Sequence, residues 1–227
     1  MNTFRRAGLA AALALTLAPL LALAAGQKEL EELMSHDGLQ KISVKDIDLA
    51  FARPGATLAS YNRIKLDPVE VAFRKDWNPE RTGSHIKLST AERESIRNGV
   101  ATIVRDAFVK ELQEKSSYKV VDESGPDVLR VRVHIANLYV NAPDTAAAGR
   151  SRTYAVSAGE MTLYAELHDS ESGEILARLV DREEGRNSGQ MQLSNSAMNQ
   201  GQAEDIATAW ARILRKGLDN AHGVGRK

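Results

Sequence analysis

Two segments of the chain carry apolar residues at the three- and four-residue spacing of an amphipathic helix. In the first, Ser89 and Glu92 form the capping-box pattern that begins a helix, and the apolar stripe continues for about 25 residues. In the second, Asn199 is a candidate cap and Gly223 a candidate stop. The stripes comprise Ile96, Val100, Ile103, Val104, Ala107, Phe108 and Leu112, and then Ala203, Ile206, Ala207, Trp210, Ile213, Leu214 and Leu218.

Alternating apolar and polar residues predict strands in five other segments. These are residues 61–74, where Pro68 interrupts the alternation, and residues 118–122, 129–135, 161–167 and 175–184. Residues 169–173 form the turn of a hairpin between the last two strands. The pattern predicts an α+β fold, a two-layer sandwich of about five mostly antiparallel strands with both helices on one face. Residues 25–60 are expected to be an N-terminal arm, residues 61–222 the sandwich domain, and residues 223–227 a disordered tail.

The same alternation predicts which side chains line the sheet face away from the helices. They are Arg130, Arg132 and His134 on one strand, Tyr164, Glu166 and His168 on the next, and Arg178 and Arg182 on the last. One interpretation is a solvated surface with charge pairs between strands. The other is a docking face for an envelope protein or a polyanionic cell-wall polymer.

Two features near this face have alternative interpretations. His134 and His168 would form a weak metal site if their strands paired in register, but two surface histidines explain them as well. Trp77 lies in a polar loop, where it is either an exposed recognition residue or a side chain folded back on the core. No metal site and no cofactor are therefore assigned.

The first 25 residues have the pattern of an export signal. Arg5 and Arg6 precede an uncharged, leucine-rich run, which ends in the small residues of Ala22-Leu23-Ala24. We expect a signal peptide over residues 1–24, with cleavage after Ala24. The alternatives are an uncleaved anchor, since about 20 apolar residues span a bilayer, and the twin-arginine route instead of the Sec route.

Composition narrows the function classes. The chain has 227 residues, 43% of them hydrophobic, with 30 basic and 30 acidic residues and no cysteine. Removing residues 1–24 leaves 28 basic residues against 30 acidic ones. The mature chain therefore lacks the excess of positive charge that nonspecific binding to nucleic acid requires. Without cysteine, disulfides, thiolate catalysis and cysteine-based metal sites are excluded. This composition suits an oxidising periplasm.

No motif of a known catalytic class is present. The sequence has no G-x-S-x-G elbow, no H-E-x-x-H pair, and no G-x-G-x-x-G or Walker loop. An envelope hydrolase with a site near His168 or His85 stays an alternative. A third hypothesis is a carrier that holds a small apolar molecule between the helices and the sheet.

Several segments resemble the family catalogued as domain of unknown function 3313, whose members are bacterial envelope lipoproteins. They are YNRIKLDPVEV at residues 61–71, SGPDVLRV at residues 124–131, AGEMTL at residues 158–163 and DSESGEILA at residues 169–177. The resemblance implies an envelope protein without an assigned reaction, and it supplies no catalytic residues. A lipoprotein needs a cysteine after its signal, and Ala24-Ala25-Gly26 has none, so a periplasmic or secreted form without a lipid anchor is implied.

The sequence therefore predicts an exported periplasmic protein, a non-enzymatic accessory or protein-interaction module that does not span a membrane after signal cleavage. Its candidate partner-binding residues are Arg130, Arg132, His134, Tyr164, Glu166, His168 and Trp77.

Overall fold

The computed structural model describes residues 27–78, 87–140, 153–155, 159–184, 192–194 and 196–224. The chain divides into two compact units, residues 1–33 and 34–227. The short helix α1 (Gln27–Met34) belongs to the first unit except for its last residue, Met34, which is the first residue of the second unit. The remaining elements are η2 (His36–Gly38), β1 (Gln40–Ile42), β2 (Leu49–Ala52), β3 (Arg63–Leu66), β4 (Glu70–Phe73), α2 (Thr90–Gln113), β5 (Lys119–Val120), β6 (Val128–Val140), β7 (Thr153–Ala155), β8 (Gly159–Asp169), β9 (Ile175–Glu184), β10 (Gln192–Ser194) and α3 (Ser196–Ala221).

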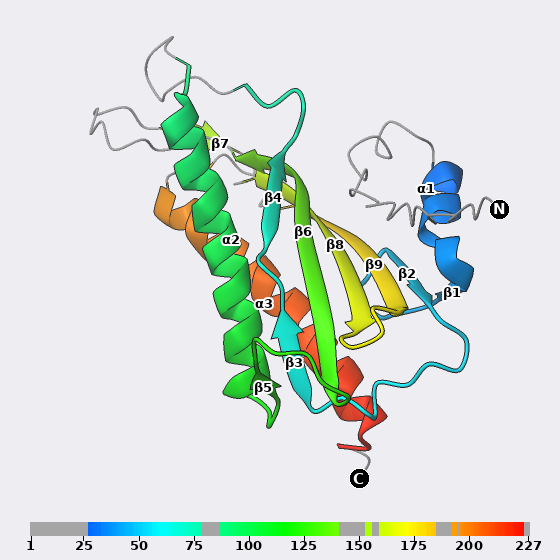
Figure 1. Ribbon diagram of the computed structural model, residues 1–227. Helices are drawn as coiled ribbons and strands as arrows, with labels where there is room; N and C mark the ends of the chain where they lie inside the picture. Colours follow the sequence, from blue (N-terminus) through cyan, green and yellow to red (C-terminus); the bar gives the residue numbers. More distant parts are fainter. Residues whose placement is uncertain are drawn as a thin grey trace, which may run out of the picture. The chain divides into compact units, whose positions relative to one another are not determined.

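The second unit is an α+β two-layer sandwich, as predicted, with α2 and α3 on one side of the main sheet (Figure 1). The sheet has eight strands rather than about five, in the order β1-β2-β9-β8-β6-β3-β5, with β4 also paired to β6. Along the order β1-β2-β9-β8-β6, neighbouring strands pair antiparallel. β3 pairs parallel with β5 and β6, and β4 pairs parallel with β6, so the sheet is mixed. A separate pair, β7 and β10, was not predicted.

The additional strands have local causes. Pro68 divides the expected strand 61–74 into β3 and β4, because proline cannot donate to the ladder, and both pieces pair with β6. Residues 40–52, expected as part of an arm, supply β1 and β2 at one sheet edge. Their short runs of alternation were too brief to predict strands.

Both long helices lie where the sequence pattern predicted them, but α3 begins at Ser196, so Asn199 lies within the helix and is not its cap. Ser89 and Glu92 form the capping box, with Ser89 N donating to Glu92 Oε2 over 2.8 Å. The stripe residues Val104, Phe108 and Leu112 are buried against the sheet. Glu111 is a charged residue outside the apolar stripe of α2. It is buried and accepts a hydrogen bond from Arg215 Nε over 3.0 Å, joining α2 to α3.

Candidate functional site

Of the eight residues predicted for the polar sheet face, the register between β6 and β8 brings six together, and Arg178 and Arg182 lie on β9. Arg130 lies opposite His168, Arg132 opposite Glu166, and His134 opposite Tyr164. Their neighbours in sequence, such as Val131 and Leu167, belong to the core beneath the helices. We call these six residues the polar face.

Glu166 is at the centre of the polar face. It accepts a hydrogen bond from Arg178 Nε over 3.0 Å, and its Oε2 lies 3.1 Å from His168 Nε2 and 3.4 Å from Arg132 Nη1. Burial alone raises the pKa of Glu166, but the hydrogen bonds with His168 and Arg178 outweigh it and lower the pKa to about 2. The carboxylate is therefore ionised at neutral pH and held by cations on both neighbouring strands.

The arginines of the polar face have partners of their own. Arg130 Nη2 is 2.7 Å from Asp67 Oδ2, and Arg132 Nε is 3.7 Å from the same oxygen. Arg178, beside Glu166, also pairs with Asp37 over 2.7 Å. The charges on this face thus neutralise one another in an ordered network.

The polar face is less open than the sequence suggested. His168 is 7% exposed and therefore buried, not solvated, with Nδ1 3.2 Å from Gly173 O. Tyr164 packs edge-on against His134, and burial raises the pKa of its hydroxyl. On the same face Phe51 and Val180 are also buried. Arg130 and Arg132, with side chains 40% and 33% exposed, are its more accessible members.

The metal interpretation of the two histidines gains no support from the described residues. His134 faces Tyr164 and His168 faces Arg130, so the two do not oppose each other. His134 Nδ1 instead lies 3.3 Å from Glu70. Within these residues no three His, Asp or Glu side chains gather closely enough to hold a metal ion.

Trp77 is folded back rather than presented to a partner. Its side chain is 4% exposed, and its ring stacks on Phe73 with centroids 4.2 Å apart. The indole Nε1 donates to Val140 O over 3.0 Å. An exposed recognition role for Trp77 is therefore wrong.

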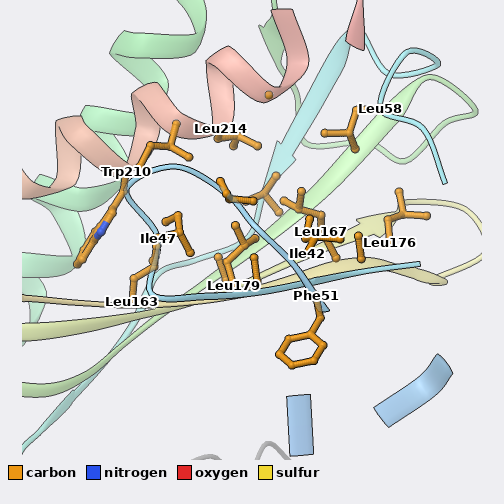
Figure 2. Close-up of a pocket in the computed structure, with 18 of the residues that line it drawn as sticks. Ile42, Ile47, Phe51, Leu58, Leu163, Leu167, Leu176, Leu179, Trp210 and Leu214 are labelled. Carbon is orange, nitrogen blue, oxygen red and sulfur yellow. The ribbon is translucent and has the colours of Figure 1, made fainter. Parts of the chain in front are cut away.

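An apolar pocket of about 300 Å³ lies between the helices and the sheet. Strands β2, β6, β8 and β9 form its floor, and α3 with Phe108 of α2 covers it. The β1–β2 connection and the segment after β2 complete the wall. The ring of Phe51 points away from the other labelled side chains, although Phe51 borders the pocket (Figure 2). The lining is Ile42, Val44, Ile47, Ala50, Phe51, Ala52, Ala56, Leu58, Phe108, Val131, Leu163, Ala165, Leu167, Leu176, Ala177, Leu179, Trp210, Ile213, Leu214 and Gly217.

The labelled lining residues extend between two ends of the pocket (Figure 2), and we call the end at Trp210 the closed end. Trp210 and Leu163 lie at one end, and each is 3% exposed. Leu58 and Leu176 lie at the other. The most exposed lining residues are Ile42, which is 43% exposed, Ala56 and Gly217, whereas others such as Leu58, Leu179 and Leu214 are partly exposed. We call Ile42, Ala56 and Gly217 the mouth.

A buried carboxylate stands behind the closed end. Asp181 accepts a hydrogen bond from Trp210 Nε1 over 2.7 Å and another from Asp48 N over 3.0 Å. Burial raises the pKa of Asp181, and Asp48 and Asp46 raise it further, against the opposing effect of the two hydrogen bonds. Asp181 thereby ties α3 and the β1–β2 connection to β9.

The pocket contains no acid–base chemistry. None of its lining residues is a histidine, a carboxylate or a hydroxyl side chain, so it does not match the hydrolase hypothesis. Sequence reasoning placed a possible ligand between the helices and the sheet, but it identified Phe108, Trp210, Ile213 and Leu214 only as stripe residues of the helices and assigned no residue to a ligand site. Their apolar side chains have the same pattern as any packed core, so only the three-dimensional arrangement separates them.

Some predicted features lie outside the described residues. These are the signal peptide with its cleavage after Ala24, His85, and the end of the tail at 225–227. No helix in the described parts of the chain is long and apolar enough to cross a membrane.

A family model described as "Protein of unknown function (DUF3313)" matches residues 30–214. Among solved structures, a Xanthomonas campestris protein of family DUF330 is similar with 14% identity and a TM-score of 0.41, covering 76% of this chain and 89% of that one. The PelC dodecamer from Paraburkholderia phytofirmans has 8% identity and a TM-score of 0.37, covering 77% and 96%. No curated protein matches. The structural similarities are weak, and no function is inferred from them.

Proposed function

The chain belongs to the family Protein of unknown function (DUF3313), and we propose that it is an exported, non-enzymatic envelope protein that binds a small apolar molecule in the pocket beneath α3. The observation that carries the proposal is an apolar cavity of about 300 Å³ that reaches solvent at its mouth. Ligand sites are concave and mostly apolar, with volumes from about 300 Å³ upward. Dry apolar cavities of about half this size take up benzene.

Trp210 provides a direct assay because its ring lines the pocket. The chain has two tryptophans, and Trp77→Phe leaves Trp210 as the sole indole. We expect 8-bromooctanoate to quench the fluorescence of this variant saturably, since a heavy atom must approach the ring closely. Calorimetric titration of the unsubstituted protein with octanoate provides a second reading that does not depend on the Trp77 substitution.

Gly217 and Gly201 supply a matched pair of substitutions on α3. A side chain at either position meets no atom within 4 Å at its Cβ, but only Gly217 lines the pocket. Gly217→Leu should fill the mouth and weaken octanoate binding roughly tenfold, equivalent to about two buried methylenes. Gly201→Leu should leave binding unchanged. The proposal is wrong if neither octanoate nor its bromo derivative binds the folded protein, or if both variants respond alike.

Export is the second part of the proposal. It is supported by Arg5, Arg6, the apolar run and the small residues before Ala25. The mass of the protein recovered from the periplasm tests it, with loss of residues 1–24 as the expected result. Recovery of the full-length chain in the cytoplasm would contradict it.

A docking role for the polar face is a second candidate, favoured by the exposure of Arg130 and Arg132. The substitution Arg132→Glu would weaken the repulsion between the polar face and a positively charged partner. It would strengthen the repulsion of a negatively charged partner. Periplasmic cross-linking of the wild type, Arg132→Glu and Tyr164→Ala tests this role. If all three capture the same proteins, the polar face is not the docking surface.

A further inference from the structure

We infer that the pocket accepts a single unbranched alkyl chain, inserted with its polar head outward at the mouth, and that Trp210 is the end wall limiting the length of that chain. The inference rests on the proposed function and adds the ligand's chemical class, its orientation and a specificity-determining residue.

The absence of polar side chains from the lining determines the chemical class. A hydroxyl, amide or charged group inside the pocket would lose its water and find no side-chain partner there, at a cost of several kcal/mol on transfer to an apolar medium. A hydrocarbon loses nothing by the same transfer. A polar head group must therefore stay at the mouth, where Ala56 and Gly217 are exposed.

The lining residues extend along both α3 and β8. Trp210 and Gly217 are seven residues apart on α3, which corresponds to roughly 10 Å at the helical rise. Leu163 and Leu167 on the floor are four residues apart on β8, which corresponds to roughly 14 Å. A volume of 300 Å³ is about twice that of a cavity that takes up benzene, so it holds roughly a dozen carbon atoms.

Trp210 is fixed in place at the closed end. Its Nε1 donates to Asp181 Oδ2 over 2.7 Å, and Asp181 is itself only 3% exposed. Swinging the indole aside would leave a buried donor and a buried carboxylate oxygen without a hydrogen bond. The wall therefore does not yield to a longer chain, unlike a wall made of flexible aliphatic side chains.

The chain offers a second wall residue and a matched control. Leu163 lies at the closed end with Trp210, whereas Leu167 lies four residues along the same strand toward the other end (Figure 2). Both leucines are buried, and both line the pocket. Leu163→Ala therefore removes part of the end wall, and Leu167→Ala removes the same atoms from the floor.

The test is calorimetric titration with saturated fatty-acid anions of 6 to 16 carbons, each below its micelle concentration. For the wild type, affinity should rise roughly fourfold with each added methylene and stop rising at about 12 carbons. Trp210→Leu and Leu163→Ala should move this limit to chains at least two carbons longer. Leu167→Ala should change the affinity for every length and leave the limit where it is.

The outcomes separate the inference from the proposed function. If no chain length binds the wild type, the proposed function itself is wrong. If the wild type binds but neither Trp210→Leu nor Leu163→Ala moves the limit, Trp210 is not the end wall. If Trp210→Leu fails to fold, Leu163→Ala against Leu167→Ala decides the question, and equal limits in these two variants would overturn the inference.

Discussion

Replacing Glu166 with glutamine should remove a specific part of the pH dependence of folding. The glutamate is paired with Arg178, Arg132 and His168, and its pKa falls from 4.5 to about 2 in the folded protein. Its folded-state pKa is depressed, so its contribution to stability is present above the unfolded pKa and disappears as the pH falls through about 2. At about 1.4 kcal/mol per pKa unit, this contribution is about 3 kcal/mol. The side chain is 23% exposed, so solvent screening removes little of it.

Urea unfolding followed by circular dichroism measures the effect at pH 7, 5, 4, 3 and 2.5. The stability difference between the wild type and Glu166→Gln should be largest at pH 7 and should shrink by about 2–3 kcal/mol toward pH 2.5. Glu171→Gln is the control, because Glu171 is exposed in the β8–β9 turn. A difference between the wild type and Glu166→Gln that stays constant across this range would refute the reasoning.

Four further substitutions test other parts of the fold by urea unfolding. Burial raises the pKa of Asp181, so ionising this carboxyl costs stability as the pH rises. The free energy of unfolding of the wild type should therefore exceed that of Asp181→Asn by less at pH 7 than at pH 4. A difference that grows with pH would contradict this. Ser89→Ala removes the capping hydrogen bond of α2 and should cost about 1 kcal/mol, with no loss counting against the cap. Gly159→Ala places a Cβ 2.3 Å from Tyr139 O and should cost about 1–3 kcal/mol, whereas Gly201→Ala in open space should stabilise α3 by about 0.5–1 kcal/mol.

Local periodicity predicted the elements of the fold that carry long, regular patterns. The stripes of α2 and α3 and the alternation along β6 and β8 each extend over several repeats, so their buried faces were identifiable. The alternation also placed Arg132 and Glu166 on the same face of the sheet, but it did not determine the register, because a slip by two residues keeps every side chain on its face. The strands β1 and β2 are three and four residues long, and their place in the sheet depends on pairing with β9 far along the chain.

The candidate sites were less predictable than the fold. Alternation placed Glu166 and His168 on an outward face, but the extent of their burial depends on three-dimensional contacts that no pattern encodes. Glu111 illustrates the same limit, since its partner Arg215 belongs to a helix 104 positions away. The pocket escaped prediction because a lining leucine and a fully packed leucine are identical in sequence.

The hydrogen bond between Asp48 and Asp181 joins positions 133 residues apart. Contacts of such long sequence separation form late, since the loop between them must first close. During synthesis, the N-terminal edge of the sheet must therefore wait for the C-terminal half before it can dock. In the folded protein we also expect local unfolding to begin at this edge, because β1 and β2 can detach while β6 and β8 stay paired. Such local unfolding would let a ligand enter and leave the pocket while the rest of the sheet stays folded.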